Sequence, residues 1–236
     1  MMEEQDILEL IKGRKSSRMP FDENRPIDPA VLKMILEAAA WAPTAHNMQN
    51  FEIVVVDDKS VLTELSKLKS PVSPVFIQEN YPQLSFSEDE WKERKTGILA
   101  EQFPPEWLSE EARQGKLQPP ASELGEQVRR GPVLLIILYD PNRRAPASEG
   151  DFLGVMSLGF MLENMWLTAA AYGIGFHILS VLGNEPLAAE VKKTLGIPRH
   201  LHIALSCRLG YPANDPPRLR VRRDLEDFVR YNRYED

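Results

Sequence analysis

Residues 152–172 read FLGVMSLGFMLENMWLTAAAY, the longest apolar run of this sequence, and the turn sequence GIG ends at residue 175 directly after it. A membrane span needs about 20 nearly uncharged residues, but Glu163 and Asn164 interrupt this run and Asp151 flanks it. A long helix that is apolar nearly all round is typical of the centre of a folded domain. We therefore expect a buried central helix at 151–172, capped by the glycines and covered in part by a second subunit, and no membrane insertion.

Short apolar segments on both sides of this helix predict a small sheet. FEIVVV at 51–56 is β-branched, and PVLLIILY at 132–139 is continuously apolar, as expected of a strand buried on both faces. The remaining expected elements are strands at 176–180 and 201–209 and helices at 5–13, 29–41, 57–68 and 186–195. In the first helix the residues expected to face inward are Ile7, Leu8, Leu10 and Ile11. The pattern indicates an α+β fold in which helices flank the sheet.

The segment from about 70 to 131 interrupts this pattern. It is polar, and residues 71–146 hold ten of the 19 prolines. An interruption of this length is typical of a functional lid or of a disordered stretch, with a helical patch expected at 88–103. We expect a single domain over 1–236 with a lid insertion at about 70–131 and a C-terminal arm at about 211–236.

Composition excludes several classes of function. The chain has 236 residues, 43% of them hydrophobic, and a formal charge of −7, which disfavours general binding of nucleic acid or anionic membranes. One cysteine, Cys207, forms no internal disulfide and holds no iron–sulfur cluster or thiolate zinc site by itself. The histidines lack carboxylates at metal-ligand spacing, so we propose no metal. The N-terminus MMEEQDILEL lacks the features of a signal peptide, and we expect a cytoplasmic protein.

A basic segment, Arg14-Lys15-Ser16-Ser17-Arg18, follows the first predicted helix. In extended backbone Arg14, Ser16 and Arg18 project together and offer guanidinium groups and a hydroxyl to a phosphate-like anion. Arg220 and Arg222 near the C-terminus share a face in the same way and could add charge to that site. The alternative for both segments is a solvated, basic surface.

Two amide side chains, Asn47 and Gln49, lie in the stretch PTAHNMQ at 43–49. Each has both a donor and an acceptor, which suits the edge of a heterocycle with alternating carbonyl and N–H groups. Ordinary turn capping is an equally good interpretation of the two amides. For His46 beside them, we favour a structural or solvent-facing role over a catalytic one. The sequence has no GxGxxG motif placed after a strand, no phosphate-binding GxxxxGK[ST] loop and no GxSxG elbow.

Taken in order, the RxSxR-type segment, WAPTAHNMQ, the long helix with Asn164 before GIG, LGYPA and the arginine cluster resemble the nitroreductase family of FMN-dependent oxidoreductases. The resemblance covers nearly the whole chain and is weakest at 70–131. It implies an α+β sandwich with a central, mainly antiparallel sheet, and an intertwined homodimer that binds FMN at the subunit interface with the long helix as dimer core.

The resemblance also implies roles for individual residues. The residues at the flavin phosphate and ribityl chain would be Arg14, Lys15, Ser16 and Arg18, completed by Arg220 and Arg222. Asn47 and Gln49 would face the isoalloxazine ring. Ser180 and Val181 would lie at the flavin, with the Ser180 hydroxyl at N5; the alternative is that Ser180 only ends a strand and bonds to backbone. The lid would determine substrate choice.

Two departures from the family pattern stand out. Many members have Pro-Trp where this chain has Asn50-Phe51, and many place a glycine-containing turn where this chain has Leu179-Ser180-Val181-Leu182. A hydroxyl residue there resembles the iodotyrosine deiodinase and dimethylbenzimidazole synthase branches. The synthases carry aspartate in place of Ser16, and no Glu–Tyr–Lys substrate clamp of the deiodinases is evident, so neither activity is assigned.

We therefore expect an enzyme that uses NADH or NADPH to reduce an electron-poor organic acceptor, such as a nitroaromatic or a quinone, through FMN. Alternatives are a non-catalytic flavin carrier or sensor, a one-electron flavin enzyme such as a reductive dehalogenase, and a flavin-free enzyme that binds a phosphorylated substrate.

Overall fold

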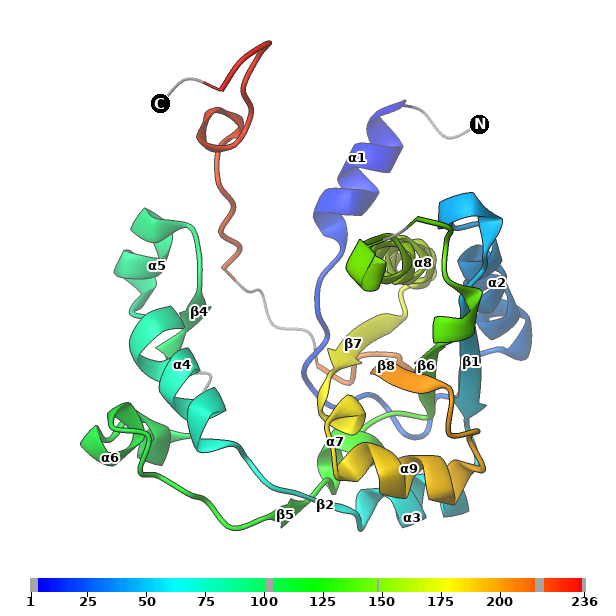
Figure 1. Cartoon of the computed structure of the whole chain (residues 1–236), viewed down its shortest axis with the longest axis horizontal. Coiled ribbons are helices and arrows are strands. Elements are labelled where there is room, and N and C mark those ends of the chain that lie inside the picture. Colours follow the sequence, from blue (N-terminus) through cyan, green and yellow to red (C-terminus); the bar gives the residue numbers. More distant parts are fainter. Residues whose placement is uncertain (1–3, 101–103, 148, 215–218, 235–236) are drawn as a thin grey trace. The chain divides into compact units, whose positions relative to one another are not determined.

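The computed structural model describes residues 4–100, 104–147, 149–214 and 219–234. The chain forms two compact units (Figure 1): residues 1–70 with 123–215, and residues 71–122 with 216–236. The first contains the sheet and the long helix. The second contains the segments that the sequence sets apart as lid and C-terminal arm.

A four-stranded antiparallel sheet forms the centre of the first unit. Its strands are β1 (Phe51–Val56), β6 (Val133–Tyr139), β7 (Gly175–Leu179) and β8 (His202–Gly210), in the spatial order β1-β6-β8-β7. Neighbouring strands pair antiparallel throughout, with one register shift between Ile137 and Leu138 of β6. The α+β class and the antiparallel sheet are thereby confirmed.

Helices cover both faces of this sheet. α2 (Pro29–Ala40) and α8 (Phe152–Ala171) lie on one face, and α3 (Lys59–Ser66) and α9 (Leu187–Leu195) on the other (Figure 1). A hydrophobic core lies on each face of the sheet, and alternate residues of β6 belong to one core or the other. Val133, Leu135 and Ile137 pack with α2 and α8, whereas Leu134, Ile136 and Leu138 pack with α3 and α9. A three-layer sandwich therefore explains why β6 is continuously apolar.

The long helix α8 is the central helix that the sequence predicts. Its inner side buries residues from Gly154 to Ala169, and Asn164 Nδ2 donates to the Ala38 carbonyl 3.2 Å away. By length and hydropathy α8 could also cross a membrane, but 44% of its 18-residue apolar window is buried inside the structure. Its outer side is apolar and exposed in the single chain, at Phe152, Leu153, Val155, Met156 and Phe160. Gly173, with φ of 67°, provides the turn into β7.

The expectation for the first helix is wrong in the single chain. α1 (Glu4–Gly13) contacts α8, but Ile7 and Leu8 are each 52% exposed and Ile11 is 43% exposed. The helix forms where predicted, yet most of its apolar side chains do not reach the core. They extend the exposed apolar surface next to α8.

The second unit consists of short elements. Its helices are α4 (Pro74–Leu84), α5 (Glu88–Arg94) and α6 (Glu110–Arg113), and β3 (Ser85–Phe86) pairs in parallel with β4 (Ile98–Leu99). An ion pair of Lys95 with Asp224 joins α5 to the C-terminal segment, and this contact raises the pKa of Lys95. The predicted helical patch at 88–103 is helical only up to Arg94, and residues 101–103 lie outside the described residues. Short elements near the unit boundaries are β2 (Lys69–Ser70), β5 (Ser122–Glu123) and α7 (Glu126–Arg129).

Candidate functional site

The basic segment 14–18 runs beside strand β7. Ser16 forms a parallel bridge with Phe176, and the Ser17 amide donates to the Phe176 carbonyl at 3.0 Å. The chain is therefore extended at this point. Extended backbone here would direct Ser16 and Arg18 to one side, and the shared orientation of Arg14, Ser16 and Arg18 stays a prediction.

Helix α8 holds the start of this segment. Arg14 Nε lies 3.1 Å from Glu163 Oε1, and the guanidinium stacks over the Trp166 ring at 4.3 Å from its centroid. Trp166 Nε1 donates to the Lys15 carbonyl at 3.2 Å, so the backbone is fixed as well. Lys15 and Arg18 are exposed. The segment thus presents positive charge from a fixed backbone.

A buried arginine lies beneath the same segment. Arg208 of β8 is only 1% exposed, and its Nη2 donates to His177 Nδ1 at 2.9 Å and approaches the Arg18 carbonyl at 3.4 Å. Accepting at Nδ1 leaves the His177 proton on Nε2. Sequence reasoning missed both residues, although a single cation within the apolar strand LHIALSCRL was a usable signal. Arg208 adds a fixed positive charge below Arg18.

The amide turn, residues 44–49, has an unusual backbone. His46, Asn47 and Gln49 all have positive φ, at 52°, 52° and 44°. Residues other than glycine rarely adopt this left-handed conformation, and such strain is concentrated at functional sites. The backbone N–H of Gln49 donates to Thr44 Oγ1 at 3.1 Å, which closes the turn.

This backbone brings the two amide side chains together. Gln49 Nε2 donates to Asn47 Oδ1 at 3.2 Å, and both residues are exposed. The left-handed turn therefore places the two side chains on one side. Ordinary turn capping does not by itself require three strained residues, and the assignment of Asn47 and Gln49 to a ligand stays a prediction.

The amide turn is anchored to the first half of α8. The Ala45 amide donates to Ser157 Oγ at 3.3 Å, and Asn50 Nδ2 donates to the Gly154 carbonyl at 3.2 Å. Asn50 is 2% exposed, and a Cβ on Gly154 would lie 2.8 Å from its Nδ2. The asparagine that departs from the family pattern therefore fastens the turn to the helix. Sequence reasoning missed this role.

Ser180 and Val181 follow the end of β7. Ser180 is exposed, and across the described ranges its hydroxyl makes no hydrogen bond, while its carbonyl accepts from the Gly183 amide at 3.0 Å. The Ser180 hydroxyl is thus available to a ligand and does not bond to backbone. Val181 is half-buried against the core that contains α9.

The basic segment and the amide turn contact different parts of α8. The basic segment contacts α8 at Glu163 and Trp166, whereas the amide turn contacts it at Ser157 and Gly154. Ser157 and Glu163 are separated by about 9 Å along the helix and by about 120° around it. Arg220 and Arg222 are exposed residues of the second unit, and their assignment to the phosphate stays a prediction.

The donor set fits FMN, the cofactor that the resemblance implies. Guanidinium groups and the Ser16 hydroxyl suit a phosphate. The paired amides of Asn47 and Gln49 suit the edge of a ring that has both donors and acceptors. The Ser180 hydroxyl can donate to or accept from a ring nitrogen.

Comparisons with known proteins agree with this interpretation. The model of the nitroreductase family matches residues 11–211. The chain is 29% identical over 192 residues to a Thermus thermophilus protein named NADH dehydrogenase, which covers 80% of each chain. It is similar to the structure of a nitroreductase with bound FMN from Bacteroides fragilis, with a TM-score of 0.57, 21% identity and coverage of 100% of this chain and 99% of that one. It is also similar to oxidized iodotyrosine deiodinase bound to FMN and 3-iodo-L-tyrosine, with a TM-score of 0.61, 21% identity and coverage of 97% and 100%. At these identities the two structures establish the fold.

Proposed function

Since the chain belongs to the nitroreductase family, we propose that it is an FMN-dependent oxidoreductase that uses NAD(P)H to reduce an electron-poor organic acceptor, such as a nitroaromatic or a quinone. The observation that carries this proposal is the strained amide turn, in which Asn47 and Gln49 adopt left-handed conformations and remain exposed. Strain of this kind persists where a site requires a particular presentation of side chains.

The residues of the chain divide between binding and orientation. Arg14, Lys15, Ser16 and Arg18 would hold the phosphate and ribityl chain, with Arg220 and Arg222 completing the phosphate site. Asn47 and Gln49 would orient the ring, and the Ser180 hydroxyl would lie at N5 beside Val181. When bound, FMN supplies the redox chemistry, and the protein contributes binding, orientation and electrostatics.

The active form is a homodimer with FMN at the subunit interface. The exposed apolar residues of α8 and α1 support this assembly, because exposed apolar surface of this kind typically marks a protein–protein interface. The placement of the basic segment and the amide turn on different sides of α8 also supports it, since a second copy can bring the two groups together. We place the enzyme in the cytoplasm.

Anaerobic reduction tests the catalytic claim. The flavin absorbance of the FMN-loaded protein should bleach rapidly on addition of NADH or NADPH and recover when a nitroaromatic or quinone is added. Bleaching by dithionite but by neither nicotinamide would instead identify a flavin carrier or sensor. Parallel titrations with the two nicotinamides determine which one is preferred.

A further inference from the structure

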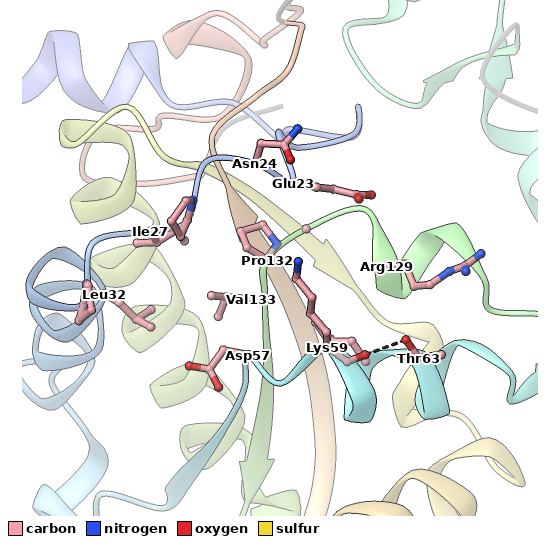
Figure 2. A pocket seen from close by; sticks show the side chains of 14 residues that line it. Glu23, Asn24, Ile27, Leu32, Asp57, Lys59, Thr63, Arg129, Pro132 and Val133 are labelled. Atoms are coloured by element: carbon pink, nitrogen blue, oxygen red, sulfur yellow. Dashed lines mark hydrogen bonds between the residues drawn. The ribbon is translucent and has the colours of Figure 1, made fainter.

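A cavity lies away from the residues assigned to FMN. It has a volume of about 720 Å³ and is formed where β1 ends and β6 begins, between the segment leading into α2 and the start of α3 (Figure 2). Small-molecule sites have volumes of about 300–1,000 Å³. None of the residues predicted to bind FMN lines this cavity.

The floor of the cavity is apolar. Ile27, Leu62 and Val133 line it, and each is less than 10% exposed. Ile27 and Val133 belong to the core on the α8 face, whereas Leu62 belongs to the core on the α3 face. The cavity therefore opens where the two cores meet at one end of the sheet.

The walls are preformed. The carboxylate of Asp28 caps α2 by accepting from the Ala30 amide at 2.8 Å, and that of Asp58 caps α3 by accepting from the Ser60 amide at 2.7 Å. Hydrogen bonds from Ser60 lower the pKa of Asp58, which keeps this cap charged at neutral pH. Pro26, Pro29 and Pro132 stiffen the backbone between these caps. A preformed wall lowers the ordering cost of binding a ligand.

Charges of both signs surround the apolar floor. In Figure 2 the Lys59 side chain extends toward Pro132 and the segment that carries Glu23 and Asn24, whereas Arg129 points away from the other labelled side chains. Within the part of the chain that the structure describes, neither Lys59 nor Glu23 forms an ion pair. A ligand with a single charge would pair with one of these two side chains and would bury the other without a partner, which is unfavourable. A zwitterion can pair with both.

We propose that this cavity is a second binding site, for a small zwitterion with an apolar body such as an amino acid with a large apolar side chain. The Lys59 ammonium pairs with the ligand carboxylate, and the Glu23 carboxylate pairs with the ligand ammonium. The apolar side chain lies against Ile27, Leu62 and Val133. The site is independent of FMN, so its failure would leave the proposed oxidoreductase function untouched.

Methyl NMR of the full-length protein, as purified, tests the site with three probes. L-Phenylalanine carries both charges, 3-phenylpropionate lacks the ammonium, and phenethylamine lacks the carboxylate. L-Phenylalanine should shift the methyl resonances of Ile27, Leu32, Leu62 and Val133. The two single-charge probes should bind up to about fivefold more weakly, the upper end for losing one exposed ion pair.

Variants separate charge recognition from general effects. Lys59→Met and Glu23→Gln should each weaken L-phenylalanine binding up to about fivefold. Lys67→Met and Glu64→Gln, which alter exposed residues outside the cavity at the other end of α3, should leave it unchanged. The proposal is overturned if no cavity methyl shifts at about 10 mM probe, a concentration that detects millimolar affinity. Equal affinity for all three probes, or equal effects of all four variants, would also overturn it.

Discussion

Arg18 offers the cleanest test of the phosphate assignment. Its side chain is exposed, and the interaction with Arg208 involves its backbone carbonyl, which substitution preserves. Arg18→Ala should weaken FMN binding by about 1.5–3 kcal/mol, the range for a hydrogen bond to a charged group. The wild-type affinity should also fall as salt is added. Fluorescence titration of the apoprotein with FMN measures both effects.

Two variants serve as comparisons for Arg18. Arg199→Ala removes an exposed arginine that is not assigned to the site and should bind FMN as the wild type does. Arg14→Ala should weaken FMN binding and also lower the melting temperature, because Arg14 contacts Glu163 and stacks on Trp166. Wild-type affinity in Arg18→Ala would exclude this segment from the phosphate site.

The Ser180 hydroxyl has no partner in the described chain, and a ligand can therefore engage it. A hydroxyl at flavin N5 accepts a hydrogen bond from N–H when N5 is protonated, which favours uptake of the first electron together with a proton. Redox titration of the FMN-loaded wild type should then proceed in two resolved one-electron steps. In Ser180→Ala the steps should merge into a single two-electron step.

Ser180→Thr is the matched control, because it retains the hydroxyl and should keep the two steps. Identical titrations for wild type and Ser180→Ala would return Ser180 to a role in ending the strand. Two-electron hydride transfer would then be the simpler mechanism.

The residues that sequence reasoning found and missed differ in a physical way. Arg14, Ser16 and Arg18 can be proposed from the sequence because local spacing determines which side chains project together, and their assignment to the phosphate stays a prediction. The Arg208–His177 contact joins residues 31 positions apart, and the Asn50–Gly154 contact joins residues 104 apart. Only the completed fold creates such pairs. The strain in the amide turn was equally invisible, because positive φ was not expected for His46, Asn47 or Gln49.

The secondary-structure elements follow the sequence closely where local signals are strong. The β1 strand spans the predicted 51–56, and α2 begins at Pro29 behind its Asp28 cap. α3 is shorter than the predicted 57–68 because Asp58 caps it and the helix begins at Lys59. Periodicity identifies an apolar face of α1 but not what covers that face, which is why the prediction that it points inward is wrong in the single chain.

The α3 cap predicts a pH dependence of stability. Hydrogen bonds from Ser60 and Val61 hold the pKa of Asp58 below its ordinary value of 3.8 in the folded chain. The cap therefore stabilises the fold at pH values above 3.8, and this stabilisation is lost as the pH falls below 3.8 through the lowered pKa. Asp58→Ala should melt below the wild type at pH 7, and the difference should narrow in acid. Thermal melts at pH 7, 5 and 3 measure it, and a difference that grows toward pH 3 would contradict this account.

The assembled molecule should be an obligate dimer. The exposed residues Phe152, Val155 and Phe160 of α8, with Ile7 and Leu8 of α1, supply an apolar surface that suits a permanent interface. We expect the buried area to exceed about 2,000 Å², the lower bound for such contacts. Light scattering should give twice the chain mass of 26.9 kDa at micromolar concentration. Phe160→Glu places a charge in the interface and should shift the equilibrium toward monomer, whereas a wild-type monomer that retains FMN would exclude the shared site.

The visible absorption spectrum of the purified protein tests the central claim, that this fold builds an FMN site, most directly. The account predicts flavin absorbance, with about one FMN per chain released on denaturation and identified by chromatography. Addition of FMN to any colourless fraction should restore the same spectrum. Colourless protein that also fails to bind added FMN would contradict the account.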